Sequence, residues 1–354
     1  MTEETGSPLR PRRSLILNLA VLTASAAATL AIAEFIVRMT PPSPHYRPET
    51  AYFDTINMPM NSLGYHDYEY DREKKAGTFR IMVVGDSFSK GEGLGFDDVY
   101  PKRLERYLNC YGNAQGICYQ VMNMSMHGRS TPEEVRLLKE YAGQYHPDVI
   151  ILSYCLNDAE DLDTLDELWR LRGIHPALLF EKPRGWRGFL YDHSTLSRLV
   201  IRRVFNTKNN RCYKKYFKAI YKDDYQGWKK TREALTELGA FSRSSGIPAR
   251  VILFPLFSFS FGDEYPFSHI HNKVHRAVEE AGLPYIDLLA NYRNMNRIRL
   301  EYIPDRDPHP DEIAHRIAAE ALWRDLKQSG LLPGDALTGK KCVFPRRCVR
   351  FVAD

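Results

Sequence analysis

The order of hydrophobic and polar positions along the chain predicts strands and helices in alternation. Short β-rich or continuous apolar runs, typical of strands buried in a parallel sheet, lie at Phe79–Val84, Gln120–Met124, Val149–Tyr154, Arg250–Phe254 and Pro284–Leu288. Helical spacing occupies Tyr100–Leu108, Pro132–Tyr145 (with Thr131 as its N-cap), Gly227–Ser245, His271–Ala281 and Pro310–Gln328. This alternation predicts an α/β domain in which helices cover both faces of a parallel sheet. Residues 158–226, approximately, interrupt the alternation, and we expect an insertion there.

The N-terminal region carries a long apolar segment. No residue from Leu15 to Ala33 is charged, and apolar residues continue past Glu34 to Val37. At about 1.5 Å per residue, a helix over 15–37 is long enough for a bilayer core of about 30 Å. Three arginines precede it, so the positive-inside rule leaves residues 1–14 in the cytoplasm and puts the body outside; they are Arg10, Arg12 and Arg13.

A cleaved signal peptide is the alternative, because Ala31-Ile32-Ala33 resembles a cleavage site. The apolar core of a signal peptide is about 7–15 residues long, shorter than this run, which favours an uncleaved signal-anchor. We therefore predict a single-pass protein of a bacterial inner (cytoplasmic) membrane with its body on the periplasmic or extracellular side. The body is exported in either case.

Composition and charge narrow the class of protein. Of 354 residues, 44% are hydrophobic and 26% charged, which excludes a disordered, collagen-like or coiled-coil chain. The net charge of +5 is weak support for nucleic-acid binding, and we predict none. A Pro-rich spacer at 38–58 follows the anchor, and a basic tail occupies 331–354. The main domain is then expected at 59–330.

Cysteine positions agree with an oxidising compartment. Cys110 and Cys118 are close in sequence, as are Cys342 and Cys348, so each pair can close a small loop. Cys155 lies in an apolar run and is predicted to be a buried thiol.

Polar residues follow the predicted strands at the edge where parallel sheets bind ligands. Gly85-Asp86-Ser87 follows the first strand, Ser125-Met126-His127-Gly128 the second and Leu156-Asn157-Asp158 the third. Asp305-Arg306-Asp307-Pro308-His309 precedes the last helix. A nucleophile, oxyanion donors, a base and an orienting acid are therefore all available for acyl transfer.

These four segments resemble, in order and spacing, the consensus blocks of the SGNH (GDSL) hydrolases. The resemblance covers roughly 60–330, and the lead-in Asn61–Tyr70 is similar to a membrane-anchored bacterial branch of that superfamily. It implies a three-layer α/β/α, flavodoxin-like fold. It also implies Ser87 as the nucleophile, His309 as the base, and an oxyanion hole made by Ser87, Gly128 and Asn157.

The last block departs from the family pattern. The usual acid lies three residues before the histidine, where this chain has Arg306. Asp307 and Asp305 flank that position. Asp307 is the preferred orienting acid because Pro308 fixes the backbone between it and His309, and Asp305 is the alternative.

Two other motifs suggest ligands less strongly. Gly91-Glu92-Gly93-Leu94-Gly95 matches neither a dinucleotide fingerprint nor a P-loop, and we expect a flexible loop beside the site. His269, His271 and His275 include two imidazoles one helical turn apart, but no carboxylate is evident nearby. We predict no metal and no cofactor.

The sequence therefore predicts a serine esterase that removes O-acyl groups, acetyl among them, from a carbohydrate or another envelope substrate. An O-acyltransferase that uses the same serine to acylate a glycan is the first alternative. A catalytically silent binding module on the same fold is the second, because the acid of the last block is displaced. We expect substrate specificity to reside in the insertion at 158–226, where no motif identifies the residues that bind substrate.

Overall fold

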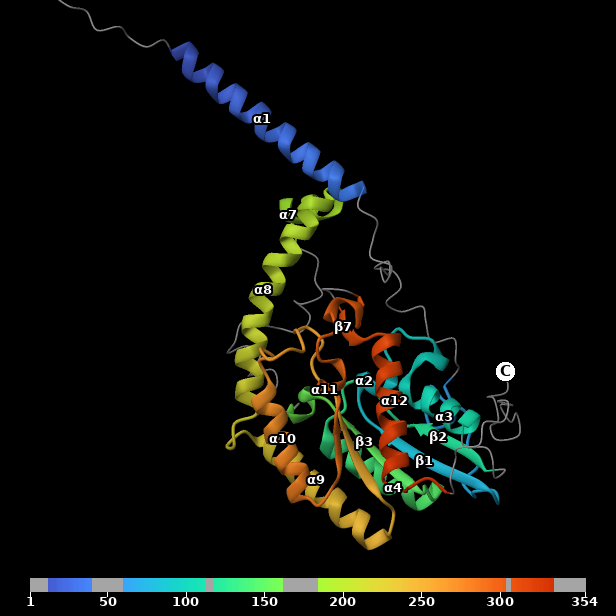
Figure 1. Cartoon of the computed structure of the whole chain (residues 1–354). Coiled ribbons are helices and arrows are strands. Elements are labelled where there is room, and N and C mark those ends of the chain that lie inside the picture. Colours follow the sequence, from blue (N-terminus) through green and yellow to red (C-terminus); the bar gives the residue numbers. More distant parts are fainter. Residues whose placement is uncertain (1–11, 40–59, 112–116, 162–183, 304–306, 334–354) are drawn as a thin grey trace, which may run out of the picture. The chain divides into compact units, whose positions relative to one another are not determined.

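The computed structural model describes residues 12–39, 60–111, 117–161, 184–303 and 307–333 (Figure 1). The chain divides into two compact units. One consists of residues 45–180 and 208–354, and the other of residues 1–44 and 181–207. The expected insertion at 158–226 is thus divided between them. The spacer at 38–58 and the basic tail fall almost wholly outside the described residues, as do Cys342 and Cys348.

The larger unit is built on a five-stranded sheet in the order β2-β1-β3-β4-β5, and every neighbouring pair is parallel. The strands are β1 (Thr78–Val84), β2 (Cys118–Asn123), β3 (Val149–Tyr154), β4 (Ala249–Leu253) and β5 (Tyr285–Asp287). This is the flavodoxin-like order, in which ligands bind where the connections diverge, between β1 and β3. The predicted fold class is confirmed, and each predicted strand is found within two residues of its expected ends.

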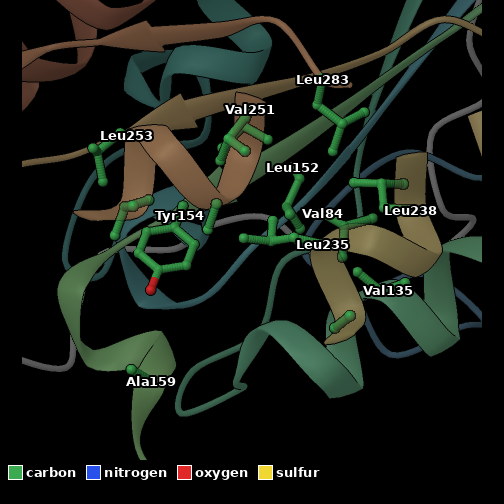
Figure 2. Packing of buried hydrophobic residues seen from close by; sticks show 14 of the residues in the cluster. Val84, Val135, Leu152, Tyr154, Ala159, Leu235, Leu238, Val251, Leu253 and Leu283 are labelled. Atoms are coloured by element: carbon green, nitrogen blue, oxygen red, sulfur yellow. The ribbon is translucent and has the colours of Figure 1, made fainter. Parts of the chain in front are cut away.

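Helices cover both faces of the sheet, as predicted. α3 (Tyr100–Tyr111) and α12 (Glu312–Gln328) contact each other over one face. α4 (Thr131–Tyr145), α9 (Gln226–Ser245) and α10 (Ser268–Glu280) cover the other. Figure 2 shows part of this second core, where Val84, Leu152 and Val251 of three strands meet Leu235 and Leu238 of α9.

Strand alternation explains why both cores form. In β1, Met82 and Val84 face the α4–α9 side, while Ile81 and Val83 face the α3–α12 side. All four are buried. Successive side chains of a strand point to opposite faces, so an uninterrupted apolar run is required when both faces are covered.

Two helix starts differ from the sequence prediction. α4 is capped by Ser130 rather than Thr131, because Ser130 and Glu133 form a reciprocal capping box. α12 begins at Glu312 rather than Pro310, because Asp311 accepts hydrogen bonds from the backbone N–H groups of Ile313 and Ala314. Pro310 belongs instead to a strand.

That strand forms a small antiparallel pair that the sequence did not predict. β7 (Asp307–Pro310) lies beside β6 (Glu301–Ile303), with Ile303 opposite Asp307. The remaining short elements of the larger unit are α2 (Ser87–Lys90), α11 (Leu289–Tyr292) and 3₁₀ turns at Phe96–Asp98, Leu156–Ala159 and Arg297–Arg299.

The smaller unit contains α1 (Arg12–Met39) and α7 (Trp186–His193) together with the first half of α8 (Thr195–Ile220), whose second half belongs to the larger unit. Within the described residues, α1 is the helix whose length and composition suit a membrane span, over Leu15–Met39. By the same criteria it could also be a signal sequence.

The cysteine predictions hold where the structure describes them. Cys110 and Cys118 are disulfide-bonded. Cys155 is a buried free thiol and Cys212 is also free.

Candidate active site

The turn after β1 presents Ser87 at the carboxyl edge of the sheet. Asp86 caps α2 by accepting a hydrogen bond from the Phe88 N–H at 2.9 Å, so Ser87 begins the helix with its side chain held at the strand end. A Cβ on Gly85 would lie 2.7 Å from the Ser153 Cβ, so only glycine lets β1 turn this close to β3. Ser87 is 5% exposed.

His309 links this serine to a buried carboxylate. Its Nε2 lies 2.9 Å from the Ser87 Oγ, and its Nδ1 lies 2.6 Å from Oδ1 of Asp307. The Asp307 side chain is fully buried and that of His309 is 14% exposed. The structure thus brings together Ser87, His309 and Asp307, whereas Asp305 lies outside the described residues.

The charges around His309 stabilise its protonated form more than water stabilises that of a free imidazole. Burial lowers the pKa of the imidazole, but the Asp307 carboxylate outweighs burial, with smaller contributions from Asp86 and Glu92. The net pKa of His309 is above its ordinary value. Phe88 packs against the ring at a centroid distance of 5.4 Å and shields one side of it.

Asn157 follows the neighbouring strand β3 and lies beside the turn that carries Ser87. It lies in the 3₁₀ turn that follows β3, and its Nδ2 donates to Oδ2 of Asp86 at 2.9 Å. The amide nitrogen carries two hydrogens, so one remains for another acceptor. Since β1 and β3 flank the switch point of the sheet, Asn157 and Ser87 lie on the two sides of the expected binding position.

Gly128 lies in the loop after β2, on the same carboxyl edge. Its φ of 74° is in the left-handed region that favours glycine, and open space surrounds the position of a Cβ.

The adjoining His127 is mostly exposed and pairs with Glu92 at 3.4 Å. The 91–95 segment therefore contacts the second block. Burial raises the pKa of Glu92, but hydrogen bonds from His127 and Lys90 outweigh it and lower the pKa to about 2.

Three buried carboxyl groups, one of them next to Ser87 in sequence, influence one another electrostatically. Burial raises the pKa values of Asp86, Asp158 and Glu134, and Asp86 raises those of the other two further. Asp158 accepts from the Thr131 hydroxyl at 3.1 Å. Sequence reasoning assigned no role to Asp86, although an acid between Gly85 and the candidate nucleophile was visible. In the structure Asp86 joins the first and third blocks.

The histidine group of α10 gains a carboxylate that the sequence did not indicate. His271 Nδ1 lies 3.0 Å and His275 Nε2 lies 2.9 Å from Oδ2 of Asp287, at the end of β5. The donor atoms lie within 4.8 Å of one another and can hold a metal ion. Two imidazoles can equally donate to one carboxylate without a metal, and hydrogen bonds from both, outweighing burial, keep the pKa of Asp287 below its usual value. His269 is not part of this group.

Comparisons with known proteins give structural matches alone. No family model and no curated protein sequence matches the chain. An acetylxylan esterase from Geobacillus stearothermophilus matches with 16% identity and a TM-score of 0.40, over 74% of this chain and 97% of its own. A psychrotrophic esterase from Pseudoalteromonas matches with 14% identity and a TM-score of 0.38, over 71% and 97%.

A G-D-S-L family lipolytic protein from Desulfitobacterium hafniense matches with 11% identity and a TM-score of 0.39, over 69% of this chain and 98% of its own. Because these TM-scores are below 0.5, the fold assignment rests on the sheet order of this chain itself. Its parallel sheet and four sequence blocks both resemble those of the SGNH hydrolases.

Proposed function

We propose that this chain is an exported serine esterase that removes O-acyl groups from a carbohydrate or another cell-envelope substrate. The observation that carries the proposal is the unbroken contact from the Ser87 hydroxyl through His309 to Asp307. A serine hydroxyl is a weak nucleophile until a hydrogen-bonded base takes its proton, and this contact supplies that base.

In the first step, Ser87 Oγ attacks the ester carbonyl while His309 Nε2 takes the hydroxyl proton. The tetrahedral intermediate collapses when His309 gives that proton to the oxygen of the leaving alcohol, and an acyl-serine remains. Water then attacks the acyl-serine while His309 takes one of its protons, and the bond between the acyl carbon and Ser87 Oγ breaks as His309 returns that proton to Oγ and the carboxylic acid leaves. Asp307 holds the tautomer with Nδ1–H and stabilises the imidazolium, but does not itself become protonated.

The negative charge of the intermediate falls on the former carbonyl oxygen. Backbone N–H groups of Ser87 and Gly128, with the remaining Nδ2 hydrogen of Asn157, are the proposed donors to it. The bond to Asp86 supports this role of Asn157, because it holds the amide in one orientation before substrate binds. Such preorganised donors stabilise the transition state without reorganising during the reaction.

The contact of Asp307 with His309 also weighs against a silent binding module. That alternative rested on the displaced acid of the last block. Asp307 Oδ1 lies 2.6 Å from Nδ1 of His309 and accepts from its backbone N–H at 3.1 Å. An acid two residues before the base can therefore orient it when the pair lies on a short strand.

Ser87→Ala tests the serine mechanism. We expect hydrolysis of a short-chain chromogenic ester to fall by a factor of about 10⁶, the loss typical of removing such a nucleophile. Labelling by a fluorophosphonate probe should disappear as well. Ester turnover by the unsubstituted protein is then measured with and without an acceptor glycan. Acceleration by the glycan would indicate transfer of the acyl group instead of hydrolysis.

Ser89→Ala is the matched control. Ser89 lies two residues after Ser87 in the same short helix, but its hydroxyl is hydrogen-bonded to the Tyr100 hydroxyl at 2.9 Å and not to His309. Labelling should therefore survive in Ser89→Ala. Retained hydrolysis and labelling in Ser87→Ala would exclude the proposed mechanism.

The same proposal includes membrane anchoring through α1, with the larger unit outside the cell membrane. Arg10, Arg12 and Arg13, which precede the apolar stretch of α1, support that orientation by the positive-inside rule. The disulfide between Cys110 and Cys118 supports it as well, because disulfides persist in oxidising compartments.

A further inference from the structure

α7 and the first half of α8 each expose an apolar face. In α7, Trp186, Phe189 and Leu190 have the i, i+3, i+4 spacing of one helix face, and the first two are 69% and 63% exposed. In α8, Val200 and Val204 lie one helical turn apart and Leu199 adjoins Val200, and these three side chains are 56%, 64% and 50% exposed. Such faces normally pack on a core, whereas these remain uncovered within the described part of their own unit.

The outer end of α1 is bonded to the junction of these two helices. Glu34 accepts hydrogen bonds from the backbone N–H groups of Thr195 and Leu196, both at 2.8 Å. It also accepts from the Ser194 hydroxyl at 2.9 Å. Arg38 donates to Glu34 at 2.6 Å and to the His193 carbonyl at 2.9 Å.

These bonds explain an acidic residue within an apolar helix. A carboxylate near the bilayer boundary is costly unless it has partners. The N-terminus of α8 supplies unpaired N–H groups and the positive end of a helix dipole, both of which stabilise a carboxylate. If α1 spans the bilayer, the bonds also place the end of α7 and the start of α8 at the level where α1 leaves the hydrocarbon.

The charge of this segment suits a phospholipid surface. Residues 184–207 contain five arginines and a single acidic residue, Asp192. Arg187 lies over the Trp186 ring at 5.3 Å, which places a cation beside an aromatic side chain typical of membrane interfaces. Apolar helix faces flanked by arginines are the pattern of helices that lie in the plane of a membrane surface.

From these observations we propose that α7 and residues 195–207 of α8 form a second membrane contact, lying in the outer-leaflet headgroup region with their apolar faces toward the acyl chains. The occupant of the exposed faces is therefore the bilayer that α1 spans, and the arginines bind lipid phosphate groups. This inference rests on the membrane anchoring included in the proposed function. It implies that the chain contacts the bilayer through two elements, α1 and the segment of α7 and α8, rather than through α1 alone.

Quenching of Trp186 by lipid tests the proposal. The full chain, with Trp169→Phe as the reference protein, is reconstituted in vesicles of phosphatidylglycerol and phosphatidylcholine brominated on its acyl chains. Bromine quenches only tryptophans that reach the acyl region. We expect partial quenching in the reference protein and complete loss of the quenched component in Trp186→Phe.

Trp323→Phe is the matched control, because Trp323 belongs to α12 in the larger unit and packs against its core. The quenched component should persist in that variant. Quenching that survives Trp186→Phe, or a Trp186 quenched by aqueous iodide but not by lipid, would overturn the proposal. Shielding of Trp186 from both quenchers would indicate a second copy of the chain and would overturn it too.

The readout does not depend on catalysis. Ser87→Ala should show the same lipid quenching as the reference protein, so failure of the esterase mechanism and failure of the membrane contact give separate results. Extraction of the reference protein from the vesicles by alkaline carbonate would identify failure of the α1 anchor itself.

Discussion

At the scale of single residues, the proposed chemistry depends on how Asp307 sets the protonation of His309. Burial alone would lower the pKa of the imidazole, and the carboxylate raises it above its ordinary value. The imidazole acts as a base only when neutral. The rate of the first step should therefore rise with pH, and its midpoint should lie above the ordinary histidine value of about 6.5.

Asp307→Asn should lower kcat by a factor of about 10⁴, because the amide no longer favours the productive tautomer or stabilises the imidazolium. Removing the negative charge leaves burial as the main influence on His309, so the midpoint of the pH profile of kcat/KM should shift to lower pH. Measuring that profile for both proteins checks the sign. An unchanged midpoint would mean that another acid orients the base.

Asn157→Ala should lower kcat by a factor of about 10²–10³ with little change in KM, the loss expected for one oxyanion donor. Thr131→Val is a useful comparison, since it removes a neighbouring hydrogen bond to Asp158 without touching the proposed donor. A change confined to KM in Asn157→Ala would indicate ground-state binding of substrate instead.

At the scale of elements, the lead-in segment is fixed to the sheet by a buried cation. Lys102 of α3 lies 2.7 Å from Asp67 and 3.3 Å from Glu105, and both ion pairs are almost completely buried. Asp67 also accepts from the backbone N–H of Asn123 in β2 at 2.6 Å. Burial raises the pKa of Glu105 to about 7 despite the nearby ammonium group. The cluster joins the lead-in, α3 and β2.

Lys102→Met should lower the free energy of unfolding by about 3–5 kcal/mol, because it leaves buried carboxylates without their cation. Lys139→Met is the control, since Lys139 pairs with Glu237 on the surface and its loss should cost less than about 1 kcal/mol. Denaturant titrations of both variants make the comparison. Equal effects would show that burial does not strengthen the Lys102 pairs.

At the scale of the whole molecule, orientation in the membrane and the disulfide are linked. Cys110 and Cys118 lie in the larger unit, which the proposal puts on the oxidising side. Cys155 and Cys212 are free thiols in the same unit and provide an internal reference. Whether Cys110 and Cys118 are disulfide-bonded or reduced therefore shows on which side of the membrane the larger unit lies.

Replacing Arg10, Arg12 and Arg13 by glutamate should reduce export, because it removes the positive charge that retains the N-terminus. In a Cys342→Ser and Cys348→Ser background, the exported chain should react with maleimide-PEG, under denaturing conditions without reductant, at its two free cysteines, Cys155 and Cys212. The glutamate variant should gain molecules labelled at Cys110 and Cys118 as well. Identical labelling patterns would contradict the predicted orientation.

The sequence alone determined the strands of the sheet, the apolar N-terminal helix and the order of the four blocks. Buried parallel strands require continuous apolar runs and a membrane helix requires a long one, so both are visible locally. The cap of α4 was misassigned by one residue, because Ser130 with Glu133 and Thr131 with Glu134 both fit the capping-box pattern, and only the structure shows that the first pair forms it.

Tertiary structure decided what local pattern could not. The β6–β7 pair is too short and too rich in proline to be predicted, yet it carries both Asp307 and His309. Asp287 lies on a different element from the histidines that it contacts, and Glu34 lies far in sequence from the helix that it caps. Contacts between distant segments depend on how the layers pack, and hydrophobic periodicity contains no information about them.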